Sequence, residues 1–143
     1  MDRPKHLDPP GGRSSAGAIV AELVARARAA QATADTFDQA RIDELVAAAG
    51  WAILEPGRNR ALAVLAVQDT GIGDVEDKVL KNHRKTLGLL RDLDGMKTVG
   101  VIAEDPGRGI TEIARPVGVV CAVTPSTNPA ATPANKIINA IKA

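Results

Sequence analysis

Aromatic side chains are almost absent from this sequence, whose 143 residues include Phe37 and Trp51 but no tyrosine. Alanine, valine, leucine and isoleucine supply nearly all of its apolar content, which favours a core of small, closely packed side chains. The shortage of stacking rings argues against a platform for nucleic-acid bases. With 18 basic and 17 acidic residues, the chain also lacks the charge excess that favours nucleic acid or an anionic membrane.

Cysteine and long apolar runs are equally scarce. The single cysteine, Cys121, excludes an internal disulfide and provides no metal-ligand set, and this usage is typical of a reducing cytoplasm. His83 has no second imidazole or carboxylate at ligand spacing, so we expect no metal site. No segment approaches the roughly 18 apolar residues of a membrane span, and we expect no membrane partner. Residues 1–15 are charged and rich in proline and glycine, which is typical of a flexible tail.

Residues 16–96 show the periodicity of amphipathic helices. A first helix is expected to run to about residue 34, and Thr36 with Gln39 three residues later predicts a capping box for a second. Pro56 and Gly57 should end that helix. Glycines at 71 and 73 should end a third, and Asp74 should cap a fourth. The simplest interpretation of this region is four packed helices without a site of their own.

After residue 96 the pattern changes to that of strands. Residues 98–103 and 110–115 are rich in β-branched side chains, and the segment between them contains Pro106, Gly107 and Gly109. Residues 97–116 are therefore predicted to form an antiparallel β-hairpin. Its strands leave edges that another part of the protein, or another subunit, should pair.

Residues 117–143 predict a strand, a polar loop and a helix. The run 117–123 is apolar and β-branched, as in a parallel strand covered on both faces, and two prolines and three hydroxyl side chains follow within residues 124–129. Thr132 and Pro133 predict a helix start, and Ile137, Ile138 and Ile141 recur at helical spacing. This is half of a βαβ unit. A parallel neighbour strand should follow, so we expect the chain to be truncated.

Several motifs in order resemble those of coenzyme A-acylating aldehyde dehydrogenases, and the wording of the loop is most similar to the sulfoacetaldehyde dehydrogenase branch. The resemblance covers about residues 16–142. The matching runs are Asp69-Thr70-Gly71-Ile72-Gly73, Val75-Glu76-Asp77-Lys78-Val79, Lys97-Thr98-Val99-Gly100-Val101-Ile102, Ala114-Arg115-Pro116-Val117-Gly118-Val119 and Thr124-Pro125-Ser126-Thr127-Asn128-Pro129.

The resemblance implies an α/β fold and an NAD- or NADP-dependent oxidoreductase that converts an aldehyde and coenzyme A to acyl-CoA. Residues 16–96 would then be the amino-terminal helices, and residues 97–116 an oligomerisation arm of a homo-oligomer. Residues 117–143 would be the first βα unit of a Rossmann-like cofactor domain. The chain is expected to be the amino-terminal fragment of such an enzyme.

The resemblance also implies a site in the loop at 124–129. Thr124, Pro125, Ser126 and Thr127 would border the nicotinamide half of the cofactor, and Thr127 and Asn128 are alternative donors to the reacting oxyanion. Relatives in the wider superfamily carry asparagine in the slot that holds Thr127 here. From the residues alone, both side chains could equally well serve a proline-rich turn.

The family's nucleophilic cysteine has no counterpart in this chain. Cys121 lies in the predicted apolar strand, where a thiol behaves as a small buried hydrophobe. The chain alone is therefore expected to be inactive. One alternative is a stand-alone interaction protein, derived from an aldehyde dehydrogenase, that docks onto another subunit through its strand edges. The other is a helical structural module in which the resemblance is a relic.

Overall fold

The computed structural model of the protein describes residues 12–143, which divide into two units between Thr36 and Phe37. The first unit contains helix α1 (Gly12–Ala34). The flexible tail predicted for residues 1–15 is wrong for residues 12–15, which are helical, and its remainder lies outside the described residues. Thr36 donates its hydroxyl hydrogen to the Thr33 carbonyl at 2.8 Å, so it closes the end of α1.

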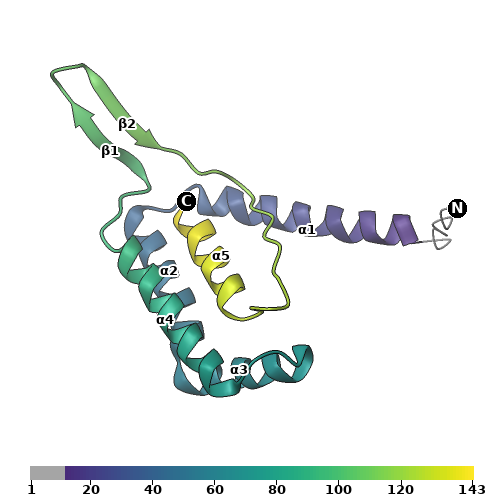
Figure 1. The fold of residues 1–143 in the computed structure, drawn as a ribbon. Helices are drawn as coiled ribbons and strands as arrows, with labels where there is room; N and C mark the ends of the chain where they lie inside the picture. The colour runs from purple at the N-terminus through teal and green to yellow at the C-terminus, as the bar shows by residue number, and fades with distance from the viewer. Residues whose placement is uncertain (1–11) are drawn as a thin grey trace, which may run out of the picture. The chain divides into compact units, whose positions relative to one another are not determined.

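The second unit contains four helices and one hairpin (Figure 1). They are α2 (Gln39–Leu54), α3 (Pro56–Thr70), α4 (Val75–Leu93), β1 (Gly100–Asp105), β2 (Ile110–Ala114) and α5 (Ala131–Lys142). The predicted helical region and hairpin are therefore present. The strand predicted at residues 117–123 is absent.

Short polar side chains set most helix starts in this unit. The cap of α2 is Asp38, whose carboxylate accepts the Arg41 N–H at 2.8 Å, so the capping box predicted from Thr36 is wrong. Glu55 lies between two helices and accepts the Gly57 and Arg58 N–H groups of α3. The predicted cap of α4, Asp74, is confirmed by its hydrogen bonds to the first turn.

The core lies where α2, α4 and α5 pack together. Its buried members are Ile42 and Val46 of α2 and Ile138 of α5. Gly50 of α2 lets α4 approach closely, because a Cβ atom at this position would lie 2.6 Å from the Leu90 Cδ1 atom. Alanine fills much of the remaining interior, as the scarcity of aromatic residues predicted.

Polar side chains occupy the buried contact between α3 and α4. Asn82 donates to the Asn59 side-chain oxygen at 3.0 Å, and Asn59 donates to the Val79 carbonyl at 3.1 Å. Both asparagines are buried, whereas Leu80 and Leu87 of α4 are exposed. Amide side chains, rather than these leucines, therefore fill the contact, because the hydrogen bonds to the Asn59 oxygen and to the Val79 carbonyl make their burial tolerable.

The hairpin pairs β1 with β2 in antiparallel register, with a bulge at Ile102 between the pairs Val101–Ile113 and Ala103–Glu112. Among the described elements, the two strands contact each other and no helix (Figure 1). Val101, Ile110 and Ile113 are about half exposed. The hairpin therefore presents apolar side chains and unpaired strand edges.

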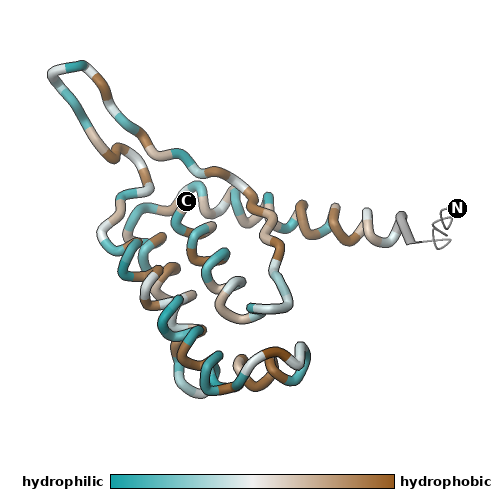
Figure 2. The backbone as a smooth tube through the Cα atoms, in the orientation of Figure 1, coloured by the Kyte–Doolittle hydropathy of each residue, from teal (hydrophilic) through white to brown (hydrophobic). Residues whose placement is uncertain are grey.

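No strand forms at residues 117–123, contrary to the sequence prediction. A strand requires hydrogen bonds to a neighbour, and in the described part of the chain β1 and β2 pair only with each other. Gly118 also has φ +88°, which interrupts the extended backbone. The segment remains apolar and exposed, including Val117 and Val123, and much of it is coloured as hydrophobic in Figure 2.

Helix α5 offers a matched test of this packing, because Ile138 is fully buried and its neighbour Ile137 is 53% exposed. We expect Ile138→Ala to lower the free energy of unfolding by about 2–5 kcal/mol, since it removes apolar contacts and leaves a cavity. Ile137→Ala should change it by less than about 0.5 kcal/mol. Urea denaturation followed by circular dichroism measures both. Equal losses would mean that α5 is not docked as described.

Candidate functional site

The loop at residues 124–130 leads directly into α5. The Asn128 N–H donates to the Pro125 carbonyl at 3.2 Å and closes a turn with Ser126 and Thr127 at its centre. The Thr132 N–H donates to the Asn128 carbonyl at 3.4 Å, which continues the chain into the helix. Helix α5 begins at Ala131 with Ala130 as its N-cap, so the cap predicted at Thr132 is two residues too late.

The turn leaves its polar side chains open. Thr124, Pro125, Ser126 and Thr127 are exposed, and Asn128 is half-buried. Within residues 12–143, the side chains of Ser126, Thr127 and Asn128 form no hydrogen bond. The structure therefore groups the predicted site residues on one loop, with two hydroxyls and an amide free to donate to a ligand.

Cys121 lies three residues before this loop and is exposed. The sequence predicted a buried thiol, because it placed Cys121 in a covered strand. That prediction is wrong here, since residues 117–123 lack the neighbouring strand that would cover it.

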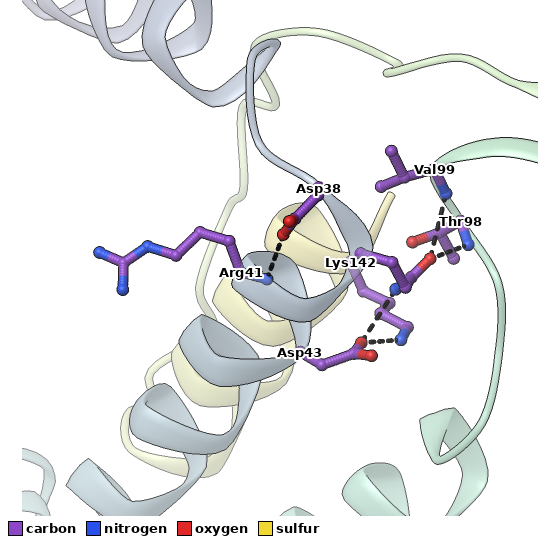
Figure 3. A network of polar contacts seen from close by, with 7 residues as sticks. Asp38, Arg41, Asp43, Thr98, Val99 and Lys142 are labelled. Atoms are coloured by element: carbon purple, nitrogen blue, oxygen red, sulfur yellow. Dashed lines mark hydrogen bonds and ion pairs between the residues drawn. The ribbon is translucent and has the colours of Figure 1, made fainter.

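A second group of polar residues, which sequence reasoning missed, joins three distant segments (Figure 3). The Gln39 side-chain oxygen accepts the backbone N–H groups of Thr98 at 2.7 Å and Val99 at 3.2 Å. The Gln39 amide nitrogen donates to Asp43 Oδ1 at 2.9 Å, one turn further along α2. Gln39 therefore holds the chain that enters the hairpin against the first turn of α2.

The same oxygen of Asp43 also accepts a hydrogen bond from Lys142 Nζ at 2.5 Å. The Lys142 side chain is 5% exposed, whereas that of Asp43 is 49% exposed. The hydrogen bond from Lys142, assisted by the one from Gln39, lowers the pKa of Asp43 despite the desolvation that opposes it. An ammonium group buried this deeply needs an acceptor, so Asp43 fixes the last turn of α5.

An open cleft of about 320 Å³ borders this ion pair. Asp43 and Lys142 lie on its wall, and its apolar lining comes from α2 and α4, including Trp51, Leu90 and Leu93. It does not include the loop at 124–130. The cleft and the predicted site residues are therefore separate features.

The sequence contains few signals that predict the contacts of Gln39, Asp43 and Lys142. Gln39, Asp43 and Lys142 are residue types that amphipathic helices usually expose, and the spacing of Thr36 and Gln39 predicts a capping box instead. The one local signal was the four-residue spacing of Gln39 and Asp43. The partners 59, 60 and 99 residues away follow only from the tertiary fold.

The fold of this chain matches that of solved aldehyde dehydrogenases. A probable aldehyde dehydrogenase from Listeria monocytogenes matches 87% of the chain with a TM-score of 0.83 and 35% sequence identity. An acetylating aldehyde dehydrogenase from Geobacillus thermoglucosidasius matches 87% of it with a TM-score of 0.81 and 37% identity. These structures confirm the fold class, and the chain covers 27% of each of them.

The sequence adds a more specific relationship. The acylating sulfoacetaldehyde dehydrogenase of Cupriavidus necator is 70% identical over 128 residues, or 90% of this chain. The resemblance to coenzyme A-acylating aldehyde dehydrogenases, including their sulfoacetaldehyde branch, is thereby confirmed. The chain spans 26% of the length of that relative. No protein-family model matches the chain.

Two further properties concern the described part of the chain alone. None of its helices is long and apolar enough to cross a membrane. Residues 12–143 also contain no group of three or more histidine, cysteine, aspartate or glutamate side chains that could hold a metal ion.

The lowered pKa of Asp43 makes its contribution to stability depend on pH. The carboxylate stabilises the fold above its unfolded-state pKa, near 4, and this stabilisation is lost as pH falls through the lowered folded-state pKa. We therefore expect Asp43→Asn to destabilise the chain at pH 7, and the difference from wild type to shrink below about pH 4.

Urea unfolding of both proteins from pH 7 to pH 2.5 measures this difference. Glu55, whose pKa is also lowered by its hydrogen bonds from Arg58 and Gly57, is present in both proteins, so its effect cancels. A difference that stays constant across this range would contradict a stabilising role for the charged form of Asp43.

Proposed function

We propose that this chain is the amino-terminal part of an NAD- or NADP-dependent oxidoreductase that converts an aldehyde and coenzyme A to acyl-CoA. Sulfoacetaldehyde is the proposed aldehyde. The observation that carries the proposal is the 70% identity with an acylating sulfoacetaldehyde dehydrogenase across 90% of this chain. The proposed enzyme is cytoplasmic, and a homo-oligomer in which the hairpin serves as the arm between subunits.

The loop at 124–127 is the proposed contact with the cofactor. NAD or NADP, when bound, would accept the hydride that leaves the aldehyde carbon. Ser126 and Thr127 fit this position because their hydroxyls are exposed and form no hydrogen bond within residues 12–143. Together with Thr124 and Pro125, they would orient the nicotinamide half against the substrate.

Thr127 is the proposed donor to the oxyanion that forms on the aldehyde oxygen. Thr127 lies at the centre of the turn and is exposed. Asn128 is half-buried, and its backbone N–H and backbone carbonyl form the hydrogen bonds of the turn. A donor aimed at the developing negative charge stabilises the transition state more than the ground state. The side-chain amide of Asn128, which forms no hydrogen bond within residues 12–143, is the alternative donor.

The chain alone should not catalyse the reaction, because the nucleophilic thiol that attacks the aldehyde has no counterpart in it. Its part in the reaction is to present the loop and the hairpin to the remainder of the enzyme. The exposed apolar side chains at 117–123 support this view, since they form a surface that further strands would cover.

A chimeric enzyme tests the proposal directly. The segment of the Cupriavidus necator enzyme that aligns with this chain is replaced by this chain, and oxidation of sulfoacetaldehyde is followed by the appearance of the reduced nicotinamide cofactor. We expect turnover that requires coenzyme A, and none from the 143-residue chain alone. A chimera that folds and assembles like the parent but shows no turnover would contradict the proposal.

Single substitutions in the active chimera test the role of Thr127. Thr127→Ala should lower kcat by about 10²–10³-fold, the loss typical of removing one oxyanion donor. Thr127→Ser should retain most of the activity, and Thr33→Ala, which removes an exposed threonine hydroxyl outside the proposed site, is the matched control. A larger loss of kcat in Asn128→Ala, with an unchanged melting temperature, would assign the role to Asn128 instead.

A further inference from the structure

Gln39 is attached at both ends of its side-chain amide. Its oxygen accepts from two consecutive backbone N–H groups at the entrance to the hairpin, and its nitrogen donates to Asp43. Rotation of the amide would exchange a donor for an acceptor and break all three contacts. The Asp43 contact therefore fixes the orientation in which Gln39 can hold Thr98 and Val99 (Figure 3).

Asp43 Oδ1 is in turn shared between Gln39 and Lys142. One carboxylate oxygen can accept two donors, and each donor helps to hold the carboxylate in the rotamer that suits the other. Lys142 lies in the last turn of α5, beyond the loop at 124–130, and its side chain is nearly inaccessible to solvent. The three side chains of Gln39, Asp43 and Lys142 are called the α2 relay below.

The α2 relay joins to one helix the chain just before a long segment and the last turn of the helix that follows it. Residues 100–130 contain the hairpin, whose strands contact no described helix, then the unpaired residues 117–123 and the candidate loop. The segment begins just after Val99, which Gln39 holds, and leads into α5, which Asp43 holds through Lys142. The two attachments meet at a single carboxylate oxygen.

We propose that the α2 relay couples the attachment of the hairpin to the docking of α5, so that Lys142 strengthens the hold of Gln39 on Thr98 and Val99. Gln39 and Lys142 are then positioning residues: Gln39 holds the entrance to the hairpin directly, and Lys142 acts on it through Asp43. The coupling does not depend on the proposed activity, because every contact in it lies within this chain. The simpler possibility is that the contacts are independent and their effects additive.

Amide hydrogen exchange at Thr98 and Val99 distinguishes coupling from additivity. Lys142 touches neither amide, so with independent contacts Lys142→Met should leave their exchange rates unchanged. With coupling, we expect Lys142→Met to raise both rates by at least about twofold, the low end of interactions within one hydrogen-bond network. In a Gln39→Ala background, where both rates are already raised, Lys142→Met should add nothing.

Matched variants control for general effects. Lys136→Met removes the same charge from an exposed position of α5 and should leave both rates unchanged. Gln31→Ala removes a glutamine–aspartate bond of the same four-residue spacing, from Gln31 to Asp35 at 2.7 Å, and should likewise have no effect. Lys142→Arg, which keeps a charged donor, should retain most of the protection.

Two results would overturn the proposal. One is an unchanged exchange rate at Thr98 and Val99 in Lys142→Met, and the other is an equal increase in the wild-type and Gln39→Ala backgrounds. If Lys142→Met fails to fold, Lys142→Gln replaces it, because it also removes the charge that Asp43 holds and changes no residue that contacts Gln39, Thr98 or Val99. The same threshold of about twofold then applies.

Discussion

One oxygen atom of Asp43 connects the three parts of the second unit that carry its distinctive features. Apolar packing of α2, α4 and α5 provides the bulk of the burial, but it is not directional. The hydrogen bonds to Asp43 Oδ1 add direction, because they join α5, through Lys142, and the entrance to the hairpin, through Gln39, to defined positions on α2. Burial of the Lys142 ammonium group favours this arrangement, since a buried charge without a hydrogen-bond acceptor would be strongly destabilising.

Most of the secondary structure was predictable because local signals decide it. Asp74 at the start of α4 and Gly71 at the end of α3 act within one turn of the helix, and both were identified from the sequence. The cap of α2 was placed two residues too early, because Thr36 and Asp38 both have the right chemistry and only their surroundings separate them. The strand prediction for residues 117–123 is wrong for a different reason. Its composition is that of a strand, but a strand also needs a partner.

The sequence predicts that the candidate site residues lie on a loop, but it does not predict how their side chains are arranged. Its residues were named from a resemblance to acylating aldehyde dehydrogenases, and the structure shows them together and open on one turn. The sequence does not distinguish Thr127 from Asn128 as the oxyanion donor, because that choice depends on which side chain faces the substrate. The α2 relay was not predicted from the sequence. Its hydrogen bonds join residues that are 59 to 99 positions apart, and contacts at such separations leave no periodic pattern in a sequence.

The scarcity of aromatic residues has a spectroscopic consequence. Trp51 is the single tryptophan in a chain without tyrosine, so nearly all of the intrinsic ultraviolet emission arises from one indole. That indole is 57% exposed and lines the cleft bordered by α2 and α4, where Leu90 and Leu93 also lie. Its emission therefore reports on the exposure to solvent of the edge of that cleft. The hairpin and the candidate loop contain no aromatic side chain, so they contribute no intrinsic fluorescence.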